Sequence, residues 1–134
     1  MSMEDSLFTK IIKGQIPVYK VYENDKTLAF MDIHPIQPGH VLVVPKVQVG
    51  YVWDMAPEDY QALMATVQKV GRRIREVFTE KERVAVIIEG LDVKDHAHVK
   101  VFPFTTDEEF RFLPDQTSEP DNVALAEIAK KLSF

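Results

Sequence analysis

The chain of 134 residues is long enough for one domain with a buried core, and a hydrophobic content of 46% is typical of globular proteins. No apolar run approaches the roughly 20 residues that a membrane-spanning helix requires, and the absence of cysteine excludes disulfides and thiolate sites. The net charge of −5 argues against nucleic-acid binding through a basic surface, although one or two local cations suffice for a small phosphorylated ligand.

Residues 1–10 contain no basic leader followed by an apolar stretch, so we expect no secretory signal. With no cysteine and no membrane-spanning run, this predicts a cytoplasmic location and no membrane partner. No repeat, low-complexity tract or linker interrupts residues 1–104. We therefore predict a single domain over residues 1–134.

The first elements in chain order are predicted to be strands. Residues 18–21 and 27–33 form a hairpin pattern, with the polar residues 23–26 as its turn. The apolar run at residues 41–44 ends at Pro45 and suits a strand that is buried on both faces.

A long helix is predicted next. Its apolar positions recur at three- and four-residue steps and form one stripe: Tyr60, Leu63, Met64, Val67, Val70, Ile74, Val77 and Phe78. Pro57 suits the first helical position, and Glu58 and Asp59 favour the positive end of the helix dipole. Ala56 is a poor N-cap residue.

Two more strands and a terminal helix complete the predicted elements. Residues 83–89 alternate around Val84, Val86 and Ile88, and residues 96–102 form a second strand after a loop at 90–95. Residues 107–120 are polar and acidic. Residues 122–132 are predicted to be a short helix, with Val123, Leu125, Ile128 and Leu132 as its apolar positions.

The strand at residues 96–102 carries the chemistry. Alternate side chains of a strand share a face, so His96, His98, Lys100 and Phe102 point one way, and Ala97, Val99 and Val101 point the other. The second set is small and apolar, as suits the core. The first set places two imidazoles and an ammonium side by side, and an anion the size of a phosphate would relieve their mutual repulsion.

Two other interpretations of this strand stay open at this point. These side chains also suit a solvent-exposed sheet face without a function. Alternatively, His96 and His98 would bind zinc or iron, with His40 completing a three-histidine site. Lys100 argues against a metal because an ammonium beside the ligands raises the cost of binding a cation.

Four segments together resemble the histidine-triad (HIT) family. They are LFTKII with IP (residues 7–12 and 16–17), AFMDI (29–33), PGHVLVVPK (38–46) and HAHVKVF (96–102), and they occur in the order and spacing of the family. The resemblance covers residues 7–104, which we expect to be the domain core, with a C-terminal extension at 105–134. It is closest to a short-loop, bacterial-type branch.

The resemblance implies an α+β fold, in which an antiparallel sheet of about five strands carries one long helix. It also implies a homodimer and a nucleoside-phosphate hydrolase or nucleotidyl transferase. In such proteins the residue at the position of His98 attacks the α-phosphorus and forms a nucleotidyl-histidine, which suits a nucleophilic neutral imidazole. His96 and His40 would orient the site and hold phosphate oxygens.

The same resemblance implies the nucleotide contacts, with a purine nucleotide as the small-molecule partner. Asp32 would accept hydrogen bonds from the ribose hydroxyls, and Leu7, Phe8, Phe30 and Ile33 would enclose the base. The simpler interpretation is core packing for these apolar residues and a strand-end acid for Asp32. We expect no cofactor and no resident metal, since Thr9 stands where zinc-bearing branches have a cysteine.

The sequence departs from the family pattern at the third triad position, where Lys100 replaces a histidine. A lysine supplies a positive charge for phosphate, but its ordinary pKa of about 10.4 makes it a poor proton acceptor. The loop at residues 89–95 also lacks a Gly-Gln-Ser/Thr segment, and Ile88 stands where an asparagine is common. Asp95 would raise the pKa of His96 or repel phosphate. These departures keep open a non-catalytic nucleotide-binding module with a degenerate triad.

Overall fold

The structure of the protein is a computed structural model that describes residues 4–110 and 117–134. Its elements are, in chain order, α1 (Leu7–Ile12), β1 (Lys20–Glu23), β2 (Thr27–Met31), β3 (Val41–Pro45), the 3-10 helix η1 (Val52–Asp54), α2 (Pro57–Val77), β4 (Arg83–Ile87), β5 (Val99–Phe104) and α3 (Asn122–Leu132). Part of the polar segment predicted at residues 107–120 lies outside the described residues.

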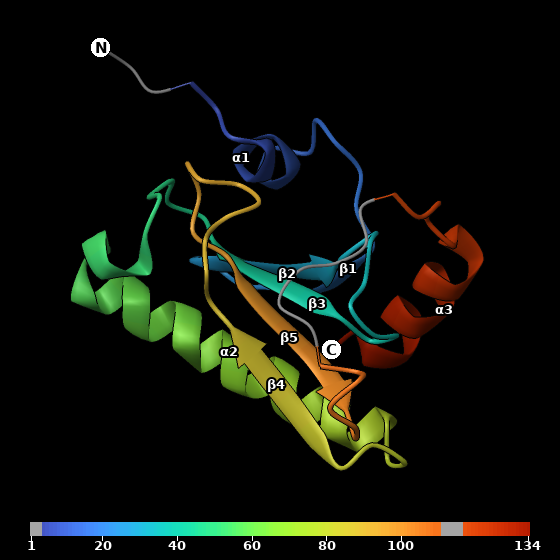
Figure 1. Cartoon of the computed structure of the whole chain (residues 1–134). Coiled ribbons are helices and arrows are strands. Elements are labelled where there is room, and N and C mark those ends of the chain that lie inside the picture. Colours follow the sequence, from blue (N-terminus) through green and yellow to red (C-terminus); the bar gives the residue numbers. More distant parts are fainter. Residues whose placement is uncertain (1–3, 111–116) are drawn as a thin grey trace.

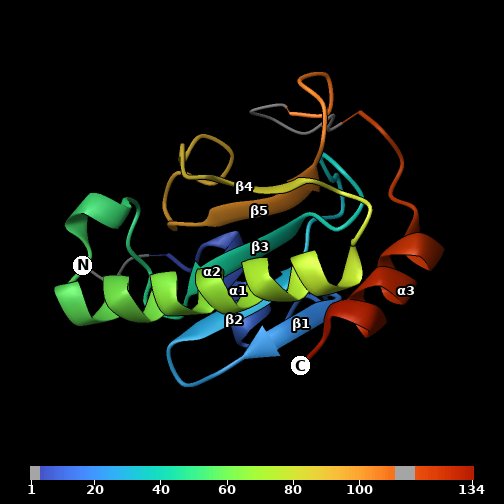
Figure 2. The ribbon, with the colours of Figure 1, turned by 90° about the horizontal axis from the view of Figure 1, so that it is seen from below.

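The strands form one five-stranded sheet in the order β1-β2-β3-β5-β4, and every neighbouring pair is antiparallel. Figure 1 shows α1 and α2 on opposite sides of this sheet, with α3 beside its β1 end. Viewed from below, α2 lies over the sheet and runs roughly along its strands (Figure 2). The predicted α+β fold, with a five-stranded antiparallel sheet, one long helix and a short terminal helix, is confirmed.

The α2 side of the sheet holds the larger core. Leu63, Val67, Val70 and Ile74 of α2 pack against inward-facing residues of the strands, among them Val43 and Val101. Pro57 is at the start of α2 as predicted, and Ala56 makes no side-chain capping bond. Burial of this apolar stripe, at about 25 cal/mol per Å², therefore holds the helix in place without a strong cap.

The other side of the sheet packs against α1 and carries the polar face of β5. Phe8 and Ile11 of α1 lie against Phe30 and Leu42 of the strands. Leu42 is opposite Lys100 in the β3–β5 register, so the Lys100 face of β5 continues this surface. Helix α1 was not predicted, because six residues are too few to show a helical period.

Several details differ from the sequence-based prediction. Strand β5 begins at Val99 and not at residue 96, since His96 and His98 lie in the segment that leads into the strand. In β4 the buried residues are Ala85 and Ile87, whereas Val86 is 47% exposed. In α3, Val123 is 73% exposed, so it does not belong to the apolar face that Leu125 and Leu132 form. No helix among the described residues is long and apolar enough to cross a membrane.

Candidate functional site

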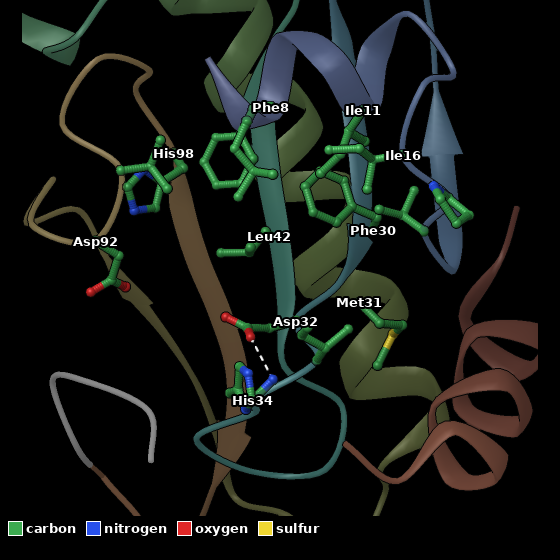
Figure 3. Close-up of a pocket in the computed structure, with 15 residues that line it drawn as sticks. Phe8, Ile11, Ile16, Phe30, Met31, Asp32, His34, Leu42, Asp92 and His98 are labelled. Atoms are coloured by element: carbon green, nitrogen blue, oxygen red, sulfur yellow. Dashed lines mark hydrogen bonds between the residues drawn. The ribbon is translucent and has the colours of Figure 1, made fainter. Parts of the chain in front are cut away.

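A cavity of about 380 Å³ lies between α1, the end of β2, the start of β3 and the loop that contains Asp92 and Val93. Its walls are mostly apolar, and its polar side chains are Asp32, His34, Asp92 and His98. Figure 3 shows His98 and Asp92 at one end, Phe30 and Ile16 at the other, and Asp32 between them. An apolar cavity with a few convergent polar groups is the usual form of a small-molecule site.

The main chain fixes the tautomer of the His98 ring at this site. Its Nδ1 is 3.0 Å from the backbone carbonyl oxygen of His96, and a carbonyl can only accept, so Nδ1–H is the donor. In the neutral imidazole, Nε2 then keeps its lone pair. The His98 side chain is only 2% exposed, and Nε2 has no hydrogen-bond partner within residues 4–110 and 117–134. A buried imidazole with a free lone pair is suited to nucleophilic attack.

His96 uses both of its ring nitrogens for structural hydrogen bonds. Nε2–H donates to the Pro45 carbonyl at 2.7 Å, which leaves Nδ1 to accept from the Ser6 hydroxyl at 2.7 Å. Burial lowers the pKa of His96, and it outweighs the Pro45 carbonyl and the Asp95 charge, which act in the opposite direction. Asp95 therefore acts in the predicted direction, but the larger effect of burial leaves the pKa of His96 lowered.

The Ser6 hydroxyl in turn belongs to the cap of α1. Its oxygen accepts from the backbone N–H of Thr9 at 3.0 Å, and the Thr9 hydroxyl donates to Gln48 Oε1 at 2.7 Å. The cap thereby joins the first helix to His96. This role of Ser6 was missed, although a serine directly before the apolar Leu7 and Phe8 is an N-cap signal.

His40 lies at the start of β3 and is completely buried. Gly39 before it has a φ of +95°, and a Cβ there would be 2.8 Å from the Phe78 ring, so only glycine fits this turn. The Nδ1 of His40 accepts from the backbone N–H of Ile36 at 3.0 Å. Burial lowers the pKa of His40 to about 3, with the charges of Lys100 and His98 acting in the same direction, so the ring is neutral at pH 7.

Neutral His40 with an accepting Nδ1 carries its proton on Nε2, which is 3.6 Å from Asp32 Oδ2. Burial raises the pKa of Asp32 to about 6, against the lowering effects of the His34 backbone hydrogen bond and the Lys100 charge. That hydrogen bond, from the His34 N–H to Asp32 Oδ1, is 2.8 Å long and is drawn in Figure 3. Asp32 is therefore mainly ionised at pH 7, and its carboxylate faces the cavity that His98 also lines.

Lys100 is buried between two carboxylates. Its Nζ is 2.7 Å from Asp92 Oδ2 and 3.0 Å from Glu89 Oε1, and the residue has no exposed surface. The interpretation of this strand as a solvent-exposed face is therefore wrong, since His96, His98 and Lys100 are all buried. The acidic partners were missed because they come from the loop before β5, whose path the sequence pattern does not reveal.

The apolar residues predicted to enclose a base divide into two pairs. Phe8 and Phe30 are buried, with ring centroids 5.8 Å apart, and Phe8 also meets the His98 ring at 5.3 Å. Leu7 and Ile33 line the same cavity but are 47% and 44% exposed. Core packing therefore describes the two phenylalanines and not Leu7 or Ile33.

The three-histidine metal site has no support in the geometry, since both nitrogens of His96 are already hydrogen-bonded. Glu89, Asp92 and His98 instead bring one potential ligand atom each within 4.8 Å of one another. The ammonium of Lys100 contacts both carboxylates, and this cation opposes a second one at the same place.

The fold and the site together define a small α+β domain with a buried imidazole at an apolar, nucleoside-sized cavity. A comparison with protein-family models finds the HIT domain over residues 13–107. The chain belongs to the HIT family. Asp32, His40, His96 and His98 all lie inside the matched range.

Relatives and solved structures agree with this assignment. The chain is 41% identical over 75 residues to the Bacillus subtilis "Protein hit", a match that spans 56% of this chain and 52% of that protein. It is 32% identical over 106 residues to a Schizosaccharomyces pombe protein named adenosine 5′-monophosphoramidase hnt1, with 76% of each chain covered. The matched segments span about half the length of the bacterial relatives.

The structure is similar to that of a Hit-like protein from Bartonella henselae, described as involved in cell-cycle regulation and crystallised with an unknown ligand. That chain has a TM-score of 0.84 and 29% identity, with 98% of this chain and 96% of that chain covered. A HIT-family protein from Bacillus subtilis has a TM-score of 0.74 and 31% identity, with 98% and 99% covered.

Proposed function

We propose that this protein is a nucleotide-binding hydrolase or nucleotidyl transferase, which cleaves at the α-phosphate of a nucleoside phosphoramidate, adenylate or dinucleoside polyphosphate. The observation that carries the proposal is the buried Nε2 of His98, which bears the lone pair of the neutral ring because Nδ1–H donates to a backbone carbonyl. Relatives named adenosine 5′-monophosphoramidases in two yeasts support the phosphoramidate as first substrate to test.

The reaction would proceed in two displacement steps. In the first, the lone pair of His98 Nε2 attacks the α-phosphorus, the bond to the leaving group breaks, and the leaving group departs with that electron pair and takes a proton from water. In the second, water attacks the phosphorus of the nucleotidyl-histidine, the phosphorus–nitrogen bond breaks, and the neutral imidazole and the nucleoside monophosphate are released. The proton lost by this water neutralises the hydroxide left by the first step. A different acceptor in place of water would make the reaction a transfer.

The remaining site residues would bind and orient the nucleotide. The ionised Asp32 carboxylate would accept hydrogen bonds from the ribose hydroxyls, and its place in the wall of the cavity supports this role. Leu7, Phe8, Phe30 and Ile33 would enclose the base. His40 would present Nε2–H to a phosphate oxygen, while His96 would support His98 through its backbone carbonyl and through the cap of α1.

The test is release of AMP from adenosine 5′-phosphoramidate by the full chain. His98→Ala should abolish this release, which for loss of a nucleophile means a decrease in kcat of at least about 1,000-fold. Lys94→Ala, an exposed position on the same loop, is the control and should retain wild-type turnover. Full activity in a folded His98→Ala protein would remove the assigned nucleophile.

A second candidate function is a non-catalytic nucleotide-binding module. The ion pairs of Lys100 with Glu89 and Asp92 favour it, because they occupy the cation that would otherwise contact phosphate. This candidate predicts AMP binding in calorimetry without AMP release. If wild type is inactive and Lys100→His restores release, the lysine is the cause of the inactivity.

We also propose that the chain works as a homodimer and as a single domain in the cytoplasm. The resemblance to the family motivates the dimer, and the composition of the chain motivates its location.

A further inference from the structure

The loop before β5 places two carboxylates beside the imidazole ring of His98. One oxygen of Asp92, one oxygen of Glu89 and a ring nitrogen of His98 all lie within 4.8 Å of one another. Both acidic side chains are about one-fifth exposed, and Asp92 lines the same cavity as His98. Anionic groups therefore border the space in which an α-phosphoryl group would react.

Two residues of this cluster each have one buried polar atom without a partner in the described parts of the chain. Within the described parts of the chain, His98 Nε2 and Glu89 Oε2 have no hydrogen-bond partner, and His98 is 98% buried. A buried polar atom without a partner is costly, and a bound ligand would relieve that cost. The cluster is therefore more than a set of surface acids.

The charges of this cluster do not balance. One ammonium from Lys100 meets two carboxylates, so the three groups together carry a net charge of −1. The ionised Asp32 adds a further negative charge across the cavity, and Asp92 is close enough to raise its pKa. The neutral rings of His40 and His96 supply no compensating positive charge at pH 7.

Reaction at His98 would bring the leaving group into this negative field. A near-attack geometry puts phosphorus about 3 to 3.5 Å from Nε2, so the leaving group is bonded to an atom next to the carboxylates. In a partly buried site an additional negative charge there is repelled, and a positive charge is attracted, far more strongly than in water.

We propose that Glu89 and Asp92 make the site select substrates by the charge of the leaving group. This rests on the function proposed above and deepens it. The preferred class is nucleoside 5′-phosphoramidates whose amine leaving group bears a second, protonated amine, and polyphosphate or carboxylate-bearing leaving groups are disfavoured. The Lys100 ammonium limits the excess negative charge, so that the α-phosphate itself can enter. In each turnover the phosphorus–nitrogen bond breaks, the amine nitrogen takes a proton from water, and the diamine leaves.

The test compares three adenosine 5′-phosphoramidates that differ only at the end of the amine chain: N-butyl, N-(4-aminobutyl) and N-(3-carboxypropyl). For wild type, kcat/KM should fall in the order cationic, neutral, anionic, with about tenfold between neighbours at low salt. The ratio should shrink in 0.5 M salt, because part of the field reaches solvent. Equal values, or a preference for the carboxylate, would overturn the proposal.

Two isosteric variants test whether Asp92 and Glu89 cause the preference for a cationic leaving group. Asp92→Asn and Glu89→Gln each remove one negative charge and leave the other carboxylate to pair with Lys100. Each should reduce the cationic-to-anionic ratio by about tenfold. The controls are Asp25→Asn and Glu80→Gln, exposed turn residues with the same change in charge, and they should keep the wild-type ratio. An unchanged ratio in both loop variants would refute the assignment.

Binding measurements distinguish failure of the proposed charge selectivity from failure of the proposed hydrolysis. If wild type releases no AMP from any of the three compounds, the proposed hydrolysis is wrong, and calorimetry with the same compounds still tests the selectivity. Affinities in the order cationic, neutral, anionic would then support it, whereas equal affinities or no binding would overturn it. The wild-type measurements require no variant, so a variant that fails to fold leaves the test intact.

Discussion

Asp32, for which we propose a role in nucleotide binding, illustrates how a single buried carboxylate lowers stability. Burial raises its pKa from 3.8 to about 6, so the folded state retains a proton that the unfolded state releases between these values. The ionised carboxylate therefore destabilises the folded state. This destabilisation is fully present above pH 6 and disappears as the pH falls towards 4. The shift corresponds to roughly 3 kcal/mol.

Asp32→Asn should consequently raise the free energy of unfolding by about 2 to 3 kcal/mol at pH 7.5, and this gain should vanish near pH 4. The amide oxygen still accepts from His34, but the charged ribose acceptor is lost, so AMP should bind about tenfold more weakly. Urea unfolding at both pH values and calorimetry measure the two effects. Asp25→Asn is the control, and a pH-independent gain would contradict the explanation.

At this scale the sequence identified the side chains better than their partners. The alternation at residues 96–102 correctly put His98 and Lys100 on one face and Val99 and Val101 on the other. The acidic contacts of Lys100 were not predictable, because they depend on the path of an irregular loop. Periodicity describes a strand, but it does not describe which loop side chain closes over that strand.

At the scale of elements, the six residues of α1 do more than their length suggests. The Ser6 cap satisfies the Thr9 N–H and donates to His96, so the same hydroxyl supports the helix and the imidazole. This short helix also supplies Leu7 and Phe8 to the cavity wall. Its position therefore decides both the shape of the cavity and the orientation of His96.

Ser6→Ala should lower the free energy of unfolding by about 1 to 3 kcal/mol, since it removes the cap and one partner of a buried ring nitrogen. It should also lower kcat/KM for adenosine 5′-phosphoramidate. Asp121→Ala is the matched control, because Asp121 caps α3 by accepting from the Ala124 N–H. That variant should lose about 1 kcal/mol of stability without loss of turnover. Equal kinetic losses in both variants would indicate general destabilisation.

The longer elements were predictable and the shortest were not. The stripe in α2 spans enough turns to show its period, and Pro57 marks its start, so both agree with the structure. The exposed side of α3 was misjudged at Val123, which lies in the first turn of the helix and is 73% exposed. Burial of a single residue depends on tertiary neighbours, which no local pattern contains.

At the scale of the whole molecule, the two edges of the sheet differ. The β1 edge is partly covered, since the Phe134 N–H donates to the Val21 carbonyl. On the outer side of β4, no strand of residues 4–110 or 117–134 forms a pair. Val86 on β4 and Ile88 just after it are 47% and 37% exposed. An apolar, unpaired edge is where a second copy would add to the sheet about a two-fold axis.

We therefore expect Val86→Asp to convert the proposed homodimer into monomers, which sedimentation velocity measures directly. Val123→Asp makes the same change on exposed α3 and should leave the assembly intact. A wild-type chain that sediments as a monomer at about 100 μM would contradict the dimer, because stable homodimers associate well below that concentration. The division into a core at 7–104 and an extension at 105–134 stays a prediction as well.

The hydrogen bond from His98 to the His96 carbonyl has a consequence for how this site tolerates change. The group that selects the tautomer of His98 is a main-chain carbonyl two residues away. Any amino acid at position 96 supplies this carbonyl, provided that the backbone keeps its position. Substitutions of nearby side chains, including the lysine at position 100, leave that acceptor in place. Mutations can thus change the charge of the site while the backbone keeps the His98 ring in the same tautomer.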